Sequence, residues 1–190
     1  MFQERAPRFG HIEVIAGSMF SGKTEELIRR LKRAQIAQLK VLIVKPITDN
    51  RYADSEVVTH DQGRMDALAV ASAREIIALA SDADVVGIDE AQFFDMDIVA
   101  VANELANAGK RVVLAGLDMD YHGEPFGPMP NLMAVAEFVT KVHAVCVRSG
   151  ELANYSHRLT ADPNRVMLGD RRTYEPLSRA EFVRERRSTK

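Results

Sequence analysis

The chain has 190 residues, of which 46% are hydrophobic, and its formal net charge at pH 7 is -2. This size fits one compact domain, or one domain with a small appendage, and the balanced charge argues against a dedicated nucleic-acid binder. The single cysteine excludes an intrachain disulfide framework and fits a reducing compartment. No segment resembles a signal peptide or a membrane span, so we expect a soluble cytoplasmic protein without a membrane partner.

Short apolar runs alternate with helical patterns through the first two thirds of the chain. Predicted strands, each rich in valine and isoleucine, cover residues 11–16, 40–45, 84–88 and 111–115. Predicted helices cover residues 24–38, 72–80 and 97–108. This repetition predicts an α/β fold in which helices cover both faces of a mainly parallel sheet.

Local signals support the predicted helices. In the first helix, Leu27, Leu31 and Ala34 recur at helical spacing and form one apolar face. Ser72, followed by Glu75, has the pattern of a capping box at the start of the second helix. Gly109 follows the third helix and is typical of a C-terminal stop.

A phosphate-binding motif lies between the first predicted strand and the first predicted helix. Residues 17–24 follow the pattern G-x-x-x-x-G-K-[ST], so we expect a P-loop NTPase-like fold. Glycines let the backbone N–H groups point at phosphate oxygens, next to a helix N-terminus. Lysine would reach the outer phosphates, and the threonine hydroxyl would bind Mg²⁺. The predicted ATP-binding residues are Gly17, Ser18, Met19, Phe20, Ser21, Gly22, Lys23 and Thr24.

Two acidic residues follow the apolar strand at residues 84–88. Asp89 is placed to hold Mg²⁺ or its water shell, and Glu90 to act as a base for an attacking hydroxyl or water. Both also belong to the predicted ATP site. Acidic residues commonly cap a helix after a strand, which is the structural alternative. Because ligands of parallel sheets bind beyond the carboxyl ends of the strands, we expect loops 46–61, 89–95 and 116–131 to converge on the phosphate loop.

The last third of the chain changes character. Short β-like runs cover residues 138–145, 154–159 and 165–168, with Ser-Gly and Asp-Pro-Asn turns between them. A short helix is expected at residues 178–187. We therefore predict two units with a boundary near Glu137: an α/β domain at residues 1–137 and a small β-rich subdomain at residues 138–190.

The chain resembles the cytosolic-type (type II) thymidine kinases. The resemblance extends from Gly10 to about Tyr174 and depends on several blocks that keep their order. Besides the phosphate loop with its Met19-Phe20, these are Lys45-Pro46, Asp49-Asn50-Arg51-Tyr52, Thr59-His60-Asp61, Gly87 to Phe94, Gly116-Leu117-Asp118 and Pro125-Phe126-Gly127. The resemblance implies a kinase that transfers the γ-phosphoryl group of ATP to the 5′-hydroxyl of thymidine, with Mg²⁺ as cofactor and a homotetramer as the assembly.

Catalytic roles follow from the same resemblance. It implies that Glu90 is the general base, that Arg51 stabilises charge on the transferred group, and that Asp49 lies near Mg²⁺ with Thr24 and Asp89. An arginine fork suits phosphate oxygens. Alternatives are a surface arginine for Arg51 and a turn-forming aspartate for Asp49. Gln92 is added to the ATP site, and the neighbouring aromatics Phe93-Phe94 are expected to pack in the core.

The resemblance also implies a nucleoside pocket. An aromatic residue shortly after Gly-Leu-Asp stacks on the pyrimidine in the family, and here this residue is Tyr121. Residues 166–174 resemble the family's lasso, which grips the base mainly through backbone hydrogen bonds. For Met19 and Leu117, plain core packing is the alternative. The predicted substrate-binding residues are Met19, Leu117, Tyr121, Phe126, Ser156, Val166, Met167, Leu168, Gly169 and Tyr174.

The chain departs from the family at its structural zinc site. The family's first cysteine pair is reduced to Cys146, with Ser149 in the second place, and the other pair is replaced by Ser178 and Glu181. One thiol cannot form a closed tetrahedral zinc site. We therefore predict no structural zinc, and a subdomain held by apolar packing of Val145, Leu159, Val166 and Leu177.

Two other functions share the phosphate loop. A P-loop ATPase of helicase-like or motor type would use Glu90 to activate water, but it would need a nucleic-acid groove or a partner interface. A non-catalytic nucleotide binder would have no use for a base and a charge-stabilising arginine. We expect thymidine and ATP as the ligands and no nucleic acid.

Overall fold

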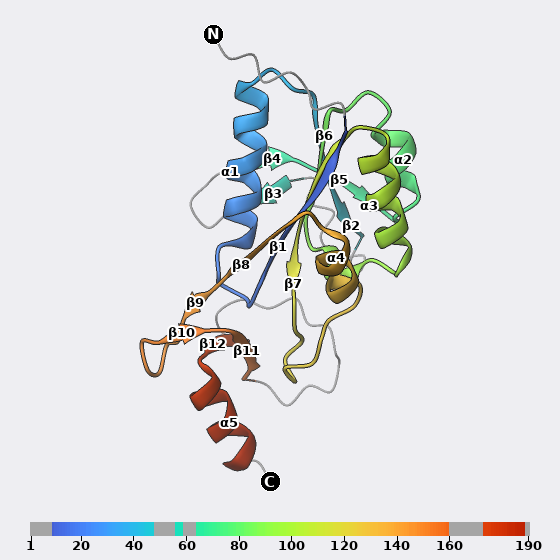
Figure 1. The fold of residues 1–190 in the computed structure, drawn as a ribbon. Coiled ribbons are helices and arrows are strands. Elements are labelled where there is room, and N and C mark those ends of the chain that lie inside the picture. Colours follow the sequence, from blue (N-terminus) through green and yellow to red (C-terminus); the bar gives the residue numbers. More distant parts are fainter. Residues whose placement is uncertain (1–8, 48–55, 59–63, 160–172, 189–190) are drawn as a thin grey trace.

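Six parallel strands form the central sheet of a computed structural model that describes residues 9–47, 56–58, 64–159 and 173–188 (Figure 1). Their order across the sheet is β5-β2-β6-β7-β1-β8, and each neighbouring pair runs parallel. Their bounds are β1 His11–Gly17, β2 Val41–Pro46, β5 Leu68–Val70, β6 Val85–Ile88, β7 Arg111–Leu117 and β8 Phe138–Val142. The predicted fold class is confirmed.

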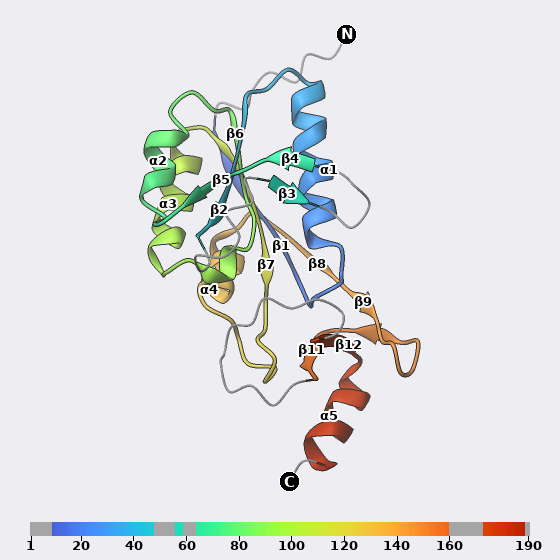
Figure 2. The same ribbon diagram turned by 180° about the vertical axis from the view of Figure 1, so that it is seen from behind.

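Helices cover both faces of this sheet (Figures 1 and 2). Helix α1 (Lys23–Ile36) packs on one face, and α2 (Glu75–Leu79), α3 (Asp97–Asn107) and α4 (Met129–Val135) pack on the other. Successive side chains of a strand point to opposite faces, so Val14 of β1 joins the core under α3 and Ile15 joins the core under α1. This burial on both faces explains why the strands read as continuous apolar runs.

The predicted helix signals can be compared with the structure. Leu27, Leu31 and Ala34 are buried under α1, as expected. Only half of the predicted capping box forms: the Ser72 backbone N–H donates to Glu75 Oε1 at 3.0 Å, but the N-cap is Arg74 and no side chain caps the helix. Helix α2 itself begins only at Glu75, later than predicted. Gly109 has a φ of 85°, the left-handed conformation of a helix stop.

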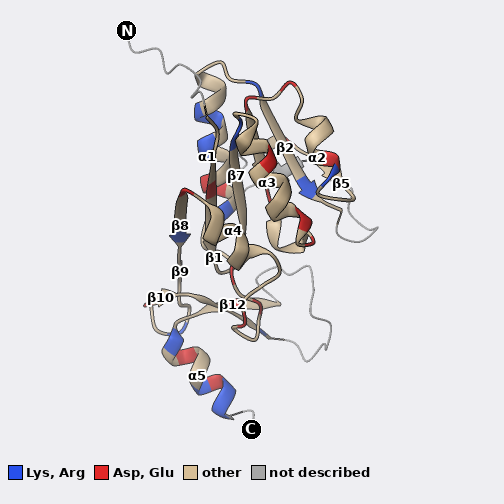
Figure 3. Cartoon of the chain, turned by 45° about the vertical axis from the view of Figure 1, so that its right-hand side comes forward, with Lys and Arg blue, Asp and Glu red and all other residues tan. Residues whose placement is uncertain are grey.

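A small unit lies beyond the carboxyl ends of β1 and β7, at the bottom of Figure 1. It contains β9 (Ala144–Val145), β10 (Leu152–Ala153), β11 (Tyr155–Arg158), β12 (Tyr174–Leu177) and the helix α5 (Arg179–Ser188). Basic and acidic side chains alternate along α5 (Figure 3). Antiparallel pairs join β9 to β10 and β11 to β12, and their buried side chains form a separate core.

One strand on the C-terminal side of the expected boundary near Glu137 belongs to the main sheet. Strand β8 was predicted to open the small subdomain, but it pairs with β1 in the main sheet from Glu13 opposite Phe138 to Gly17 opposite Val142. Backbone groups on this side of β1 need hydrogen-bond partners, which β8 supplies. Just before β8 begins, the Glu137 carboxylate accepts the Ile12 N–H at 2.7 Å. The division of the chain into domains stays a prediction.

Several short elements were not predicted from the sequence. They are β5, α4, the 3₁₀ turn η1 (Ala91–Phe93), and a hairpin of β3 (Glu56–Val58) and β4 (Arg64–Asp66). Helix α4 was read as loop because it starts beside Pro128 and Pro130. Proline is compatible with the first turn of a helix, where its missing N–H has no partner to lose. Among the described residues, no helix is long and apolar enough to cross a membrane.

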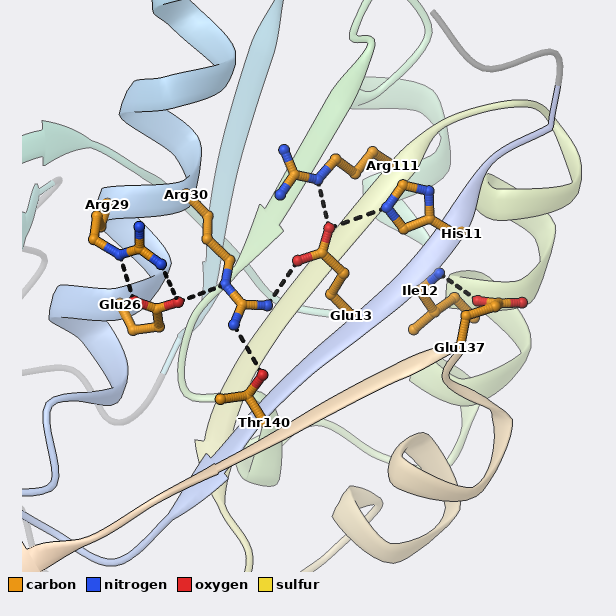
Figure 4. A network of polar contacts seen from close by, with 9 residues as sticks. All are labelled: His11, Ile12, Glu13, Glu26, Arg29, Arg30, Arg111, Glu137 and Thr140. Carbon is orange, nitrogen blue, oxygen red and sulfur yellow. Dashed lines mark hydrogen bonds and ion pairs between the residues drawn. The ribbon is translucent and has the colours of Figure 1, made fainter.

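A network of polar contacts fastens α1 and two neighbouring strands to β1 (Figure 4). The buried Glu13 carboxylate accepts hydrogen bonds from Arg111 at 2.6 Å and from Arg30 at 2.7 Å. Arg30 also donates to Thr140 of β8 at 2.9 Å and to Glu26 at 2.8 Å. The buried Glu13 carboxylate of β1 is therefore paired with guanidinium groups from α1 and β7.

Candidate active site

The phosphate loop connects β1 to α1 and depends on two glycines. A Cβ atom at Gly17 would lie 2.2 Å from the Val142 carbonyl oxygen, so no side chain fits there. Gly22 has a φ of 82° directly before the first residue of α1. Phe20 adopts a φ of 61° between them, which is uncommon for a residue with a side chain. The curl expected of a phosphate loop is therefore present.

The lysine of the motif lies over its own loop. Lys23 Nζ and Ser21 Oγ each donate a hydrogen bond to the Ser18 carbonyl oxygen at 2.7 Å. Burial lowers the pKa of Lys23, although the negative charges of Glu90 and Asp89 oppose this effect. The ammonium group is thus partly desolvated and surrounded by the two acidic residues that the sequence singled out.

Asp89 lies within reach of the threonine of the motif. Thr24 Oγ1 donates to Asp89 Oδ2 at 3.3 Å, and the Glu90 backbone N–H donates to Asp89 Oδ1 at 3.0 Å. Burial, together with the charge of Glu90, raises the pKa of Asp89 to about 7. A hydroxyl and a carboxylate are oxygen ligands of the kind Mg²⁺ prefers, so the two side chains fit the predicted metal.

Glu90 is exposed and held by an amide. Its backbone is left-handed, with a φ of 52° at the start of η1. Gln92 Nε2 donates to Glu90 Oε2, while Gln92 Oε1 accepts the Leu117 N–H at 2.9 Å. Gln92 itself is only 2% exposed. The Gln92 amide, assigned to the ATP site by resemblance, thus holds the Glu90 carboxylate and ties η1 to the end of β7.

The phosphate loop also contacts the small unit. The Met19 backbone N–H donates to Ser156 Oγ at 3.0 Å, and Ser18 Oγ donates to the Ala153 carbonyl oxygen at 3.4 Å. Ser156 is a predicted substrate-binding residue, and its hydroxyl contacts Met19, which is assigned to both the ATP site and the nucleoside site. The two predicted sites are therefore adjacent.

Two predicted pocket residues, Tyr121 and Tyr174, both contact Arg158, which was not predicted from the sequence. The Arg158 guanidinium lies 3.8 Å from the centroid of the Tyr121 ring. It also donates to the Tyr174 hydroxyl, from Nε at 3.0 Å and from Nη2 at 2.7 Å. Arginines on β-like runs are common on surfaces, so only the strand pairing of β11 with β12 reveals this contact.

The loop that carries Tyr121 is ordered by its own side chains. Asp120 Oδ1 accepts the N–H groups of His122 at 2.9 Å and Glu124 at 3.1 Å. Further along, the Phe126 ring meets Phe93 edge to face, with ring centroids 5.7 Å apart. Phe126 thus contacts η1, beside Glu90. Phe94 is buried in the core, as expected, and Phe93 is only partly buried.

The end of β7 carries one more buried carboxylate that the sequence did not assign. Asp118 Oδ2 forms an ion pair with Lys141 of β8 at 2.8 Å. Leu117, directly before it, is partly buried and donates its N–H to Gln92.

Six predicted site residues lie outside the described residues. They are Asp49, Arg51, Val166, Met167, Leu168 and Gly169. Their assigned roles remain predictions.

The positions that replace the zinc ligands form hydrogen bonds. Ser149 Oγ lies 3.5 Å from Ser178 Oγ, which in turn accepts the Glu181 N–H at 3.5 Å. Burial alone would raise the pKa of the Cys146 thiol, but hydrogen bonds from Ser149 and from nearby backbone N–H groups lower it to about 7. One thiol, two hydroxyls and one carboxylate at these four positions do not match the donor set of a structural zinc site, which is built from cysteine and histidine. Within the described part of the chain, no three His, Cys, Asp or Glu side chains gather as a metal site.

The packing expected around these positions is partly wrong. Leu177 is fully buried, but Val145 is 65% exposed and Leu159 is 48% exposed. Val166 lies outside the described residues. Instead, aromatic side chains contribute to this core. The rings of Tyr155 and Phe182 stack with centroids 4.3 Å apart.

Comparison with known proteins gives a consistent result. The family model described as thymidine kinase matches residues 10–182. A thymidine kinase of Bacteroides fragilis (strain YCH46) is 54% identical over 93% of this chain and 89% of the relative. Those of Rhodothermus sp. and Porphyromonas gingivalis are 58% and 57% identical, over 91% and 90% of this chain and 81% and 84% of the relatives. Among solved structures, the flagellar accessory protein FlaH of Methanocaldococcus jannaschii aligns with a TM-score of 0.52 at 12% identity, covering 77% of this chain and 76% of FlaH. That likeness concerns the fold alone.

Proposed function

The chain belongs to the thymidine kinase family and is a kinase, and we propose that Glu90 is the base of its reaction. That reaction transfers the γ-phosphoryl group of ATP to the 5′-hydroxyl of thymidine, giving thymidine monophosphate and ADP. Glu90 takes the hydroxyl proton as the oxygen attacks phosphorus. General-base assistance of this kind typically contributes about 10²- to 10⁴-fold.

The observation that carries this proposal is the support given to the Glu90 side chain. It is exposed to an incoming substrate, yet Gln92 donates to one of its oxygens from a buried position tied to β7. Its neighbour Asp89 is buried beside Thr24 instead. The environments of the adjacent carboxylates therefore favour different tasks, an accessible base and a metal ligand.

Positioning and charge neutralisation are the remaining requirements of phosphoryl transfer. The backbone of the phosphate loop and Lys23 would bind the ATP phosphates. Thr24 and Asp89 would hold Mg²⁺, which would neutralise negative charge on the phosphates. Asp49 and Arg51 are assigned to the metal and to the transferred group by resemblance alone.

The rival ATPase function has no support. No contact among the described residues and no comparison favours a helicase-like or motor protein. A homotetramer, a cytoplasmic location, the lack of structural zinc and the lack of a nucleic-acid partner stay proposals.

Substitution of the base tests the mechanism. Glu90→Gln keeps the size of the side chain but removes the basic oxygen, so we expect kcat for thymidine to fall by roughly 10²- to 10⁴-fold. ATP binding, measured by calorimetry, should change little. Glu151→Gln, at an exposed position of the small unit, is the matched control and should leave kcat unchanged. Near-normal turnover by Glu90→Gln would contradict the assignment.

A further inference from the structure

Strand β11 presents one face to the site. Because side chains alternate along a strand, Ser156 and Arg158 share a face, and Tyr155 lies on the other. Ser156 accepts the Met19 N–H of the phosphate loop, whereas Tyr155 stacks on Phe182 in the core of the small unit. The face that carries Arg158 is therefore turned toward the phosphate loop.

Arg158 joins two elements that are far apart in the sequence. It is only 7% exposed, and it lies opposite Tyr174 in the register of β11 and β12. Two of its nitrogens donate to the Tyr174 hydroxyl, and its guanidinium carbon Cζ lies 3.8 Å from the centroid of the Tyr121 ring. One side chain thus contacts both tyrosines predicted to enclose the nucleoside.

The chemistry of these contacts requires arginine. Two nitrogens of a rigid planar fork converge on one hydroxyl, and the delocalised cation lies against an aromatic ring, where cation–π attraction applies. Lysine carries the same charge on a flexible stem and cannot make both contacts in this geometry. Burying the side chain is costly, so its contacts must be maintained.

We propose that Arg158 is a positioning residue that holds Tyr121 and Tyr174 in the geometry that receives the pyrimidine base. This proposal rests on the proposed function, because it assumes that the two tyrosines enclose a nucleoside. Arg158 sets the affinity for the nucleoside acceptor and leaves the binding of ATP phosphates to the phosphate loop.

The test compares kinetic constants for the two substrates. Arg158→Lys should lower kcat/KM for thymidine by about 10-fold or more, mainly through KM, while KM for ATP stays within about 2-fold. Tyr174→Phe removes the acceptor of both hydrogen bonds and should also raise KM for thymidine. Combined with Arg158→Lys, it should add less than it does alone, because both changes remove the hydrogen bonds to the Tyr174 hydroxyl.

A second readout does not depend on activity. The chain has four tyrosines and no tryptophan, so its near-ultraviolet circular dichroism reports mainly on tyrosine environments. Arg158→Lys should change the tyrosine signal of the substrate-free protein. Arg148→Met is the matched structural control, because Arg148 pairs with Glu175 and Glu185 in the same small unit but contacts neither pocket tyrosine. It should lower thermal stability and leave both the tyrosine signal and KM for thymidine unchanged.

The outcomes separate the proposals. If the wild-type chain phosphorylates thymidine while Arg158→Lys keeps the wild-type KM for thymidine, the role of Arg158 is overturned and the function stands. An equal rise in KM for ATP and thymidine would also overturn it, since that indicates general disruption. Failure of the wild-type chain to phosphorylate any nucleoside would instead overturn the proposed function and, with it, this role.

Discussion

Adjacent acidic residues at the end of β6 differ because their surroundings differ. Asp89 is buried against Thr24, and burial penalises its charged form, with Glu90 adding like-charge repulsion. The pKa of Asp89 therefore rises from 3.8 to about 7. Because its surroundings disfavour the charged form, the Asp89 carboxyl group lowers the stability of the fold at neutral pH. A bound cation would offset this cost.

This cost gives a prediction with a definite sign. Between pH 3.8 and about 7 the unfolded chain releases a proton that folded Asp89 retains, so the stability falls as pH rises through this window. Without nucleotide or metal, Asp89→Asn should be more stable than the wild type at pH 8, by about 1 kcal/mol or more. The difference should disappear below pH 3.8. Denaturant unfolding at several pH values measures it, with the exposed Asp66→Asn as control. A variant less stable than the wild type at pH 8 would contradict the burial argument.

At the scale of elements, the strand pattern identified the four inner strands, β1, β2, β6 and β7, but not the edge strand β5 or the place of β8 in the sheet. The pattern succeeded for β1, β6 and β7 because both of their faces are buried, which selects valine and isoleucine. It failed for the membership of β8, whose partly exposed residues pair with β1 through the backbone. Backbone pairing has no side-chain signature, so its partner strand emerges only from the folded chain.

The paired carboxylate of β1 makes a second prediction. Burial would raise the pKa of Glu13, but hydrogen bonds and charge from Arg111, with further bonds from His11 and Arg30, hold it below its usual value. Glu13→Gln should therefore destabilise the protein by about 1.5–3 kcal/mol at pH 7. Because the folded pKa lies below the unfolded value of 4.5, this stabilisation is present above that pH and is lost as pH falls through the folded pKa.

The control lies on the same network. Glu26 also pairs with two arginines, and its hydrogen bond with Arg29 is the main reason that its pKa is lowered to about 2. The Glu26 side chain is 19% exposed against 9% for Glu13, and its partner Arg29 is exposed, so solvent screens these charges more and Glu26→Gln should cost only about 1 kcal/mol. Chemical denaturation at pH 7 compares the two variants. Equal losses of stability in the two variants would contradict the expectation that the buried Glu13 pairing contributes more than the Glu26 pairing.

For the whole molecule, the phosphate-loop residues lie in short local motifs, whereas the arginine that contacts the two pocket tyrosines does not. Lys23, Thr24 and Asp89 belong to short motifs at strand ends, so their positions follow from local sequence and the parallel sheet. Arg158, Tyr121 and Tyr174 belong to three separate segments of the chain. Their meeting depends on how the small unit packs against the phosphate loop, and no local pattern encodes that packing.

The small unit gives the last prediction, because Ser149, Ser178 and Glu181 replace three of the family's four zinc ligands. Its folding should depend on the core around Leu177 and not on a metal. Elemental analysis of purified protein should find zinc far below one equivalent, and a chelator should leave Tm unchanged. Leu177→Ala, by contrast, should cost about 2–5 kcal/mol because it opens a cavity in this core, whereas Val145→Ala at an exposed position should be nearly neutral. Stoichiometric zinc, or a Tm that falls on chelation and recovers when zinc is added, would show that a metal holds the unit after all.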